Sequence, residues 1–236
     1  GMDRTHNPEF TCMELYVQYK DYNWMMAFTE QLLENICTKV NGKPESVVDG
    51  QLISFKAPYR RLPILDAIKE KTGFDLNGMT EDEIRNVCRQ LKMEVDETMG
   101  KGKLIDEIFG EFCEGQFIQP TFIIDYPVEM SPLTKMHRSK PGLTERFELM
   151  VNGKELANAY SELNDPIDQE ERFIDQMKLA DKGDDEAMVI DQDFLRALQY
   201  GMPPTSGIGI GIDRLVMLMT GQTAIQEVLF FPQMRP

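Results

Sequence analysis

The sequence predicts an α+β fold in which an antiparallel sheet is flanked by helices. Asn152-Gly153 is typical of a two-residue hairpin turn, and strand-like segments lie on either side of it at 146–151 and 155–162. Helix-like segments are inserted between such hairpins or laid on them, which disfavours a doubly wound parallel sheet. The 236 residues, 42% of them hydrophobic, are enough for one sizeable domain with a hydrophobic core.

The first half of the chain is expected to be rich in helix. Apolar side chains at helical spacing predict a helix over about 22–39, with these residues facing inward: Trp24, Phe28, Leu32, Leu33 and Ile36. Asp49-Gly50 predicts a short hairpin within 47–55. A mostly helical segment is expected over about 64–118, interrupted by glycines, with a capping box at 80–83.

Alternation and helical spacing predict the remaining elements. Strands are expected at 10–19, 121–125, 146–151, 155–162, 207–212 and 227–231. Further helices are expected at 166–180, 193–200 and 213–220. In the first of these helices the inward side chains are expected to be Ile167, Phe173, Ile174 and Met177.

The composition limits the kinds of partner and compartment. A formal net charge of −15 repels phosphate backbones, so strong binding to nucleic acid is expected to need a separate basic module or a local patch. Four cysteines without a CxxC pair, and only two histidines, predict reduced, buried thiols rather than a zinc site. No run of about 18 apolar residues predicts a membrane span, and the polar N-terminal residues favour the cytoplasm.

Glu148 and Glu155 are the first candidate site. If Met150 faces Glu155 across the hairpin and Glu148 faces Ala157, the two carboxylates are diagonal neighbours on one face of the sheet. They could then share an oxygen-seeking divalent cation such as Mg²⁺. The spacing by itself fits two solvated glutamates on an exposed face at least as well.

Asn158, Tyr160 and Glu162 are the second candidate site, because they alternate onto one face of a strand. An amide, a phenol and a carboxylate suit a cationic, hydrogen-bonding ligand, and a buried carboxylate would select an ammonium group. A polar edge strand is the competing interpretation. Glu155 and Asn158 differ by three positions, so a common site requires a β-bulge near Ala157.

The third candidate site is the glycine-alternating segment 207–214. Gly207, Gly209 and Gly211 leave one strand face without side chains, where a flat ring or a sugar can contact the backbone. Arg214 begins the next helix, where its guanidinium and free amide groups can meet phosphate oxygens. A glycine-rich core strand against a crowded neighbour is the competing interpretation, and the pattern matches neither a Rossmann motif nor a P-loop.

The fourth candidate site is the segment from His6 to Tyr16. Phe10 could stack on a base, while Glu14 and Tyr16 point along one strand face. Taken singly, these residues fit a loop, a core aromatic and a half-buried strand. A small basic cluster of Lys135, His137 and Arg138 fits a solvated loop better than a phosphate clamp.

Together these segments resemble the class II lysyl-tRNA synthetases over essentially the whole chain. HNPEFTCMELYVQYKDY resembles the second half of motif 2, and PPTSGIGIGIDRLVMLMTG resembles motif 3. QPTFIIDYPVEMSPL, RFELMVNGKELANAYSELND and GDDEAM lie between them in the order typical of the family. Aspartyl and asparaginyl relatives differ in the HNPEFT and NAYSELND stretches, so the resemblance favours lysine as the substrate and a class II catalytic-domain fold.

The resemblance implies a role for each candidate residue. Arg214 is the implied catalytic residue, and Glu148 and Glu155 are the implied Mg²⁺ ligands. Implied ATP contacts are His6, Phe10, Glu148, Glu155, Gly211 and Arg214, with the Phe10 ring on adenine. Implied lysine contacts are Glu14, Tyr16, Asn158, Tyr160, Glu162, Gly207 and Gly209, with Tyr16 and Glu162 at the side-chain ammonium.

The resemblance further implies a two-step reaction with ATP, L-lysine and tRNA(Lys), carried out by a cytoplasmic homodimer. Residues 1–236 would be part of a catalytic domain, without the anticodon-binding domain, motif 1 and the first strand of motif 2. Such a fragment is expected to be inactive or nearly so by itself. Two alternatives remain: a paralogue that attaches a lysine derivative to a translation factor, and a non-catalytic nucleotide-binding module.

Overall fold

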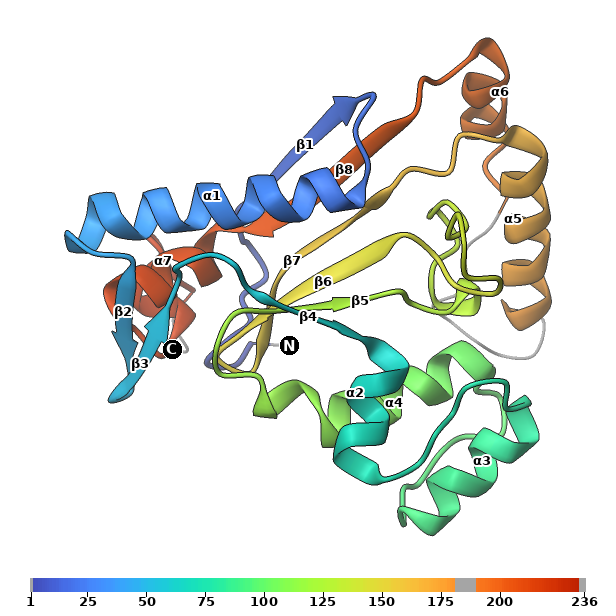
Figure 1. Ribbon diagram of the computed structural model, residues 1–236, viewed down its shortest axis with the longest axis horizontal. Coiled ribbons are helices and arrows are strands. Elements are labelled where there is room, and N and C mark those ends of the chain that lie inside the picture. Colours follow the sequence, from blue (N-terminus) through green and yellow to red (C-terminus); the bar gives the residue numbers. More distant parts are fainter. Residues whose placement is uncertain (1, 181–189, 234–236) are drawn as a thin grey trace.

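A six-stranded sheet forms the centre of the molecule, in a computed structural model that describes residues 2–180 and 190–233 (Figure 1). The strand order is β1-β8-β7-β6-β5-β4, and all neighbours are antiparallel except β4 and β5. The strands are β1 Cys12–Gln18, β4 Arg60–Pro63, β5 Thr121–Ile124, β6 Arg146–Val151, β7 Lys154–Ser161 and β8 Thr205–Gly211. The predicted α+β class is confirmed, although the short strand β4 was not expected.

Two helices, α1 (Tyr22–Asn41) and α7 (Ile212–Thr220), cover one face of this sheet (Figure 1). The Asp21 carboxylate caps α1 by accepting from the Trp24 N–H. The predicted helix is confirmed, but its most buried apolar side chains are Met25, Met26, Leu33 and Cys37. Of the residues predicted to face inward, Leu33 is buried and these four are only partly buried: Trp24, Phe28, Leu32 and Ile36.

The predicted helical segment is a compact unit at the β4–β5 edge (Figure 1). It contains α2 Ile64–Thr72, α3 Glu81–Gln90, α4 Lys101–Phe112 and the short η1 Glu114–Gln116. The capping box is confirmed, since the Thr80 hydroxyl accepts from the Glu83 N–H and the Thr80 N–H donates to the Glu83 carboxylate at 2.7 Å. A second hydrophobic cluster inside this unit packs against Ile123 of β5.

The predicted hairpin near Asp49-Gly50 is confirmed as β2 (Glu45–Val48) and β3 (Gln51–Ser54). Both turn residues have positive φ angles, 50° and 77°, as a tight hairpin turn requires. Residues 227–231, all of which the structure describes, form no β-strand, so the strand predicted there was wrong. This region holds the short helix η3 (Ile225–Glu227), and no strand of the sheet lies beside it to supply hydrogen bonds.

Helices α5 (Pro166–Ala180) and α6 (Gln192–Tyr200) are confirmed and pack on each other through Phe173 and Phe194, whose ring centroids are 6.0 Å apart. Phe173 is buried as predicted. Ile167 is 70% exposed, and Ile174 and Met177 are also exposed, so these three predictions were wrong. The GDDEAM stretch lies outside the described residues.

Three of the four cysteines, Cys37, Cys88 and Cys113, are buried and unoxidised, as predicted, whereas Cys12 is exposed. Burial raises the pKa of the Cys113 thiol to about 11. None of the helices in the described ranges has both the length and the hydropathy needed to cross a membrane.

Candidate active site

A β-bulge sets the geometry of the β6–β7 hairpin. Leu149 opposes Ala157, but Met150 opposes Glu155, so Leu156 is the extra residue on β7. The bulge predicted near Ala157 is confirmed. It also shifts the register by one, so Glu148 opposes Asn158 and the predicted pairing of Glu148 with Ala157 was wrong. As a result Glu148, Glu155 and Asn158 are brought to the same face of the sheet.

The glycines of β8 form a bare strip between the polar side chains of β7 and β1. Asn158, Gly209 and Glu14 form one row across the three strands, and Tyr160, Gly207 and Tyr16 form the next. The isoleucines of β8, Ile208 and Ile210, are buried on the opposite face. The predicted division between a glycine face and an isoleucine face is therefore confirmed.

Gly207 lies directly beneath the Glu162 carboxylate and the Tyr16 ring. A Cβ atom there would meet the Glu162 carboxylate and would lie 2.7 Å from Cε1 of the Tyr16 ring. The missing side chain therefore makes room for a carboxylate and a phenol to meet over the strand. By contrast, a Cβ atom at Gly209 would have only an ordinary contact, 3.7 Å from Sγ of Cys12.

Glu162 is an acidic group without a cation. Within residues 2–180 and 190–233, its carboxylate makes no hydrogen bond or ion pair, and its burial raises its pKa to about 7. Burial and then Glu162 raise the pKa of Tyr160 to about 12, and burial, Glu14 and Glu162 raise the pKa of Tyr16. This end of the site is an electronegative pocket that a cationic ligand would complete.

Glu148 and Glu155 line an acidic hollow of about 440 Å³. Its carboxylates come from β6, β7 and the α4–η1 region: Asp106, Glu107, Glu111, Glu114, Glu148 and Glu155. Burial and the neighbouring Glu148 raise the pKa of Glu155 to about 7, although Arg214 and Arg146 act in the opposite direction. Among the described residues no three side chains are arranged to hold a metal by themselves. Mg²⁺ commonly uses one or two carboxylates and completes its shell with water and phosphate oxygens, so this pair fits it.

A second hollow, of about 350 Å³, lies at the end of β8. Glu155 lines both hollows, so the two adjoin. His6, Phe10, Gly211 and Arg214 line it. The Phe10 ring is 66% exposed and free to stack, and a guanidinium nitrogen of Arg214 donates to the Glu155 carbonyl oxygen. The segment carrying His6 and Phe10 is held to α7 because the Thr11 N–H donates to the Asp213 carboxylate at 2.6 Å.

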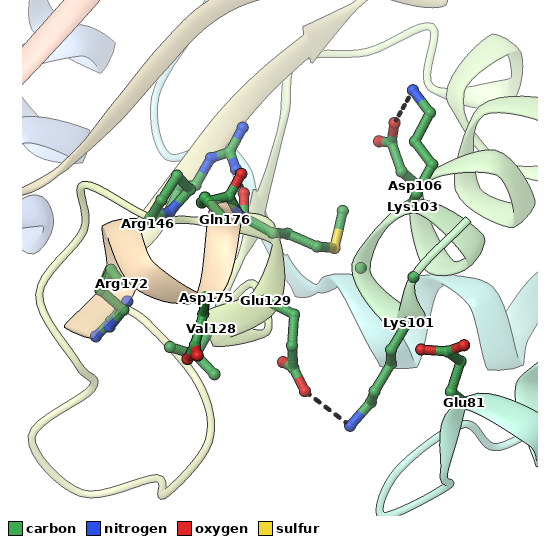
Figure 2. A pocket seen from close by; sticks show the side chains of 14 residues that line it. Glu81, Lys101, Lys103, Asp106, Val128, Glu129, Arg146, Arg172, Asp175 and Gln176 are labelled. Atoms are coloured by element: carbon green, nitrogen blue, oxygen red, sulfur yellow. Dashed lines mark hydrogen bonds and ion pairs between the residues drawn. The ribbon is translucent and has the colours of Figure 1, made fainter. Parts of the chain in front are cut away.

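Another hollow, of about 690 Å³, lies between α4, η2 (Val128–Met130) and α5 (Figure 2). Lys101 at the start of α4 pairs with Glu129 at 3.1 Å across it. Its charged lining is balanced, with Lys101, Lys103, Arg146 and Arg172 against Glu81, Asp106, Glu129 and Asp175. This balance gives the hollow no clear preference for an anion or a cation.

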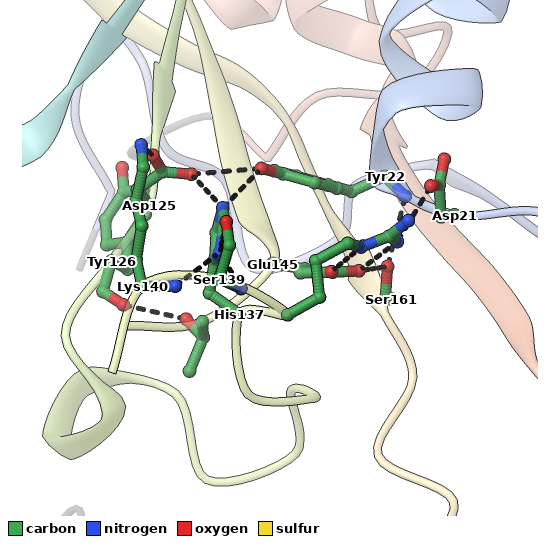
Figure 3. Close-up of polar contacts among 11 residues, drawn as sticks. Asp21, Tyr22, Asp125, Tyr126, His137, Ser139, Lys140, Glu145 and Ser161 are labelled. Atoms are coloured by element: carbon green, nitrogen blue, oxygen red, sulfur yellow. Dashed lines mark hydrogen bonds and ion pairs between the residues drawn. The ribbon is translucent and has the colours of Figure 1, made fainter. Parts of the chain in front are cut away.

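The basic cluster predicted to be a solvated loop is largely tied to the protein (Figure 3). His137 is mostly buried and its Nε2 lies 3.2 Å from the Tyr22 hydroxyl, which donates to Asp125. Arg138 binds Glu145 and Asp21, and Glu145 accepts from the Ser161 hydroxyl at 2.6 Å. Since Ser161 precedes Glu162, this network fixes the end of β7 next to Glu162. The solvated-loop interpretation was wrong for His137, whereas Arg138 remains 60% exposed on the loop.

Arg146 is the charged residue of this face that the sequence reasoning missed. It lies between Glu148 and Asn158, with Nη2 2.6 Å from Glu148 Oε1 and Nε 3.2 Å from Asn158 Oδ1. Arg146 stands two residues before Glu148 in the same strand, so the alternation that selected Glu148 also places Arg146 on its face.

The chain matches the model of the class II tRNA synthetases (D, K and N) over residues 1–235 and belongs to this family. It is 72% identical over all 236 residues to a protein of Porphyromonas gingivalis named lysine–tRNA ligase, of which it covers 41%. Proteins of the same name from Christiangramia forsetii and Azobacteroides pseudotrichonymphae are 69% and 67% identical, with 42% and 47% of their lengths covered. The predicted resemblance to the lysyl enzymes is confirmed, and the chain spans less than half the length of these relatives.

Proposed function

We propose that the protein containing this chain is a lysine–tRNA ligase, which activates L-lysine with ATP and transfers it to tRNA(Lys). The observation that carries the proposal is the Glu162 carboxylate, which is half-buried over Gly207, beside the Tyr16 ring, and has no cationic partner among the described residues. A lysine ammonium at this place would meet Glu162 and the Tyr16 phenol together. The names of three relatives, each at least 67% identical, support this choice of substrate.

In the proposed complex, the amino acid and the nucleotide lie next to each other on one face of the sheet. The lysine side chain lies over Gly207, and its carboxylate reaches toward Asn158. Adenine stacks on Phe10, the phosphates extend past His6 to Arg214, and Gly211 allows close approach to the backbone. Glu148 and Glu155 would hold Mg²⁺, which when bound neutralises triphosphate charge.

The proposed reaction has two steps. A lysine carboxylate oxygen attacks the α-phosphorus of ATP, the bond to the bridging oxygen breaks, and pyrophosphate leaves. The terminal ribose hydroxyl of tRNA then attacks the lysyl carbonyl and AMP leaves. The chain contributes by orienting both substrates and by placing the Arg214 guanidinium where negative charge develops. We place this reaction in the cytoplasm, in a homodimer.

The direct test is ATP–pyrophosphate exchange by the full gene product that contains this chain, with each standard amino acid in turn. We expect exchange with lysine alone, and loss of at least about a hundredfold in kcat/KM for Glu162→Gln, because the ammonium then has no counter-charge. Glu170→Gln, on exposed α5 surface, is the matched control and should retain activity. Absence of lysine-dependent exchange by the unmodified protein would refute the proposal. In a separate incubation with labelled lysine, transfer of the lysine to a protein instead of tRNA would favour the paralogue.

A further inference from the structure

We infer that Arg146 is a positioning residue that orients the metal-binding carboxylate of Glu148 and the lysine-binding amide of Asn158 together. This inference rests on the proposed function and adds a residue to its site. The guanidinium lies between the two side chains on the β6–β7 face, and it contacts both without reaching into the hollow that contains Phe10 and Arg214.

The guanidinium is fixed on all sides. Nη2 donates to Glu148 Oε1 at 2.6 Å and Nε donates to Asn158 Oδ1 at 3.2 Å. Nη1 donates to the Met130 carbonyl oxygen at 2.7 Å and to the Ser131 hydroxyl at 3.1 Å. The group therefore bridges two strands of the sheet and the end of η2 with the residue after it.

An aromatic ring completes the support. The guanidinium carbon of Arg146 lies 4.5 Å from the ring centroid of Tyr126, which is buried. The Arg146 side chain is only 15% exposed, so its stacking and hydrogen bonds are largely shielded from water. A lysine at this position has one compact ammonium and cannot stack or reach these partners at once.

These contacts determine which atoms face a ligand. A guanidinium can only donate, so the Asn158 atom that it contacts is the carbonyl oxygen, and the Asn158 NH₂ group remains to donate elsewhere. Asn158 lines the hollow at the end of β8, where that NH₂ can meet a carboxylate oxygen of an amino acid. In the same way, Arg146 occupies one Glu148 oxygen and leaves the other for a metal.

The test measures lysine binding directly, in the full gene product, by titration calorimetry without ATP or metal. Arg146→Lys should weaken lysine binding about tenfold, because the amide of Asn158 loses its fixed orientation. Arg172→Lys is the matched control. Arg172 also binds this segment, through the Ser131 carbonyl oxygen at 3.2 Å, but it pairs with Asp168 and touches neither Glu148 nor Asn158, so binding should not change.

A double-mutant cycle distinguishes positioning from general support of the fold. If Arg146 acts through Asn158, Arg146→Lys should have little further effect on lysine binding once Asn158→Ala is present. Additive losses would overturn the inference. Mn²⁺ binding in the presence of ATP, followed by electron paramagnetic resonance, should also weaken about tenfold in Arg146→Lys, and an unchanged value would remove the role at Glu148.

Asn158→Asp keeps the inference testable if the Arg146 variants fail to fold. This variant retains an oxygen acceptor for Arg146 but has no NH₂ group, so lysine binding should fall at least tenfold. Unchanged binding would show that the amide presents its oxygen to the ligand, contrary to the inference. Failure of the unmodified protein to bind lysine would instead refute the proposed function, so the two failures are distinguishable.

Discussion

At the residue scale, Glu162 has an environment that a free carboxylate in water would not have. Burial raises its pKa to about 7, and Glu162 in turn helps to raise the pKa values of Tyr16 and Tyr160. Such a group is costly in the unliganded protein and becomes favourable only when a cation enters. Under the proposed function, this cost would favour lysine over neutral amino acids.

The raised pKa of Glu162 predicts a pH dependence of lysine binding. Ionised Glu162 is needed to pair with the ammonium, so affinity should be constant well above pH 7 and fall toward about tenfold per pH unit below it. Calorimetric titration between about pH 5.5 and pH 8.5 measures this. Glu162→Gln should bind weakly and without this dependence, and a flat profile for the unmodified protein would contradict the assignment.

The same carboxylate should make the unliganded protein less stable as the pH rises, although lysine binding becomes stronger. Its pKa is raised in the folded state, so its contribution is fully present below the ordinary value of 4.5 and is lost as the pH rises through about 7. Glu162→Gln should therefore increase the free energy of unfolding by about 1–3 kcal/mol at pH 8 and by little at pH 4.5. Urea unfolding at the two pH values gives the comparison.

Gly207 provides a second prediction at the residue scale. In Gly207→Ala the new methyl group would occupy the space of the Glu162 carboxylate and the Tyr16 ring, so lysine affinity should fall more than about thirtyfold. Gly209→Ala adds the same methyl group to the same strand with only an ordinary contact at Cys12, so its loss should be much smaller. Equal effects of the two substitutions on calorimetric lysine binding would argue against a lysine site at Gly207.

At the element scale, helix α4 is fixed against η2 by a close backbone approach. A Cβ atom on Gly102 would lie 2.8 Å from the carbonyl oxygen of Glu129 and 3.0 Å from its carbonyl carbon. Lys101, one residue earlier, pairs with the Glu129 carboxylate. Met130 and Ser131, at the end of η2, accept hydrogen bonds from Arg146, so α4 supports the site through η2. The sequence predicted Gly102 only as an interruption of a helical segment.

Two glycines of α4 give opposite predictions. Alanine is the better helix former, so Gly110→Ala, which has open space around it, should raise the free energy of unfolding by about 0.5–1 kcal/mol. Gly102→Ala should lower it by about 1–3 kcal/mol, because the backbone of Glu129 must move. Thermal unfolding of both variants tests this, and stabilisation by Gly102→Ala would show that the contact is not tight.

Part of the geometry of the β6–β7 hairpin follows from its own sequence. The turn at Asn152-Gly153 was predictable because both residues accept positive φ angles, here 53° and 72°. The need for a bulge was predictable from the three-residue spacing of Glu155 and Asn158. Its place, at Leu156, was not, because ladder pairing on both sides selects which residue is left unpaired.

At the scale of the whole molecule, β5 joins the two hydrophobic clusters. Phe122 packs with Phe147 under α1, at 4.9 Å between ring centroids, whereas Ile123 points to the opposite face, into the cluster of α2, α3 and α4. Since successive residues of one strand serve both clusters, neither can separate from the other without losing β5. We therefore expect the sheet and the helical unit to unfold together.

Ile123→Ala tests this cooperativity. The substitution leaves a cavity in the second cluster and should lower the free energy of unfolding by about 2–5 kcal/mol. The single tryptophan, Trp24, lies in α1 on the other face, so its fluorescence reports the first cluster, whereas far-ultraviolet circular dichroism reports helices of both. The two signals should shift together to one lower midpoint, and separate transitions would indicate two independent units.

The sequence by itself determined the elements whose signals are local. Helical spacing and caps located α1 and the helical unit, turn residues located both hairpins, and alternation placed Glu14, Tyr16, Asn158 and the glycines on strand faces. These signals depend on neighbours a few residues apart, so one chain is enough to read them. The absent strand at 227–231 shows the limit, because a strand also needs a partner edge that local pattern cannot supply.

Only the tertiary structure decided which faces meet. The pairing of β1, β8 and β7 brought Tyr16, Gly207 and Glu162 together although Tyr16 precedes the other two by 146 residues or more in the sequence, and the bulge turned Glu155 toward Glu148. It also placed Arg146 between the two candidate sites and brought the acidic side chains of α4 beside them. Burial raises the pKa of Glu162, and burial is a property of the packed molecule, which no spacing of residues encodes.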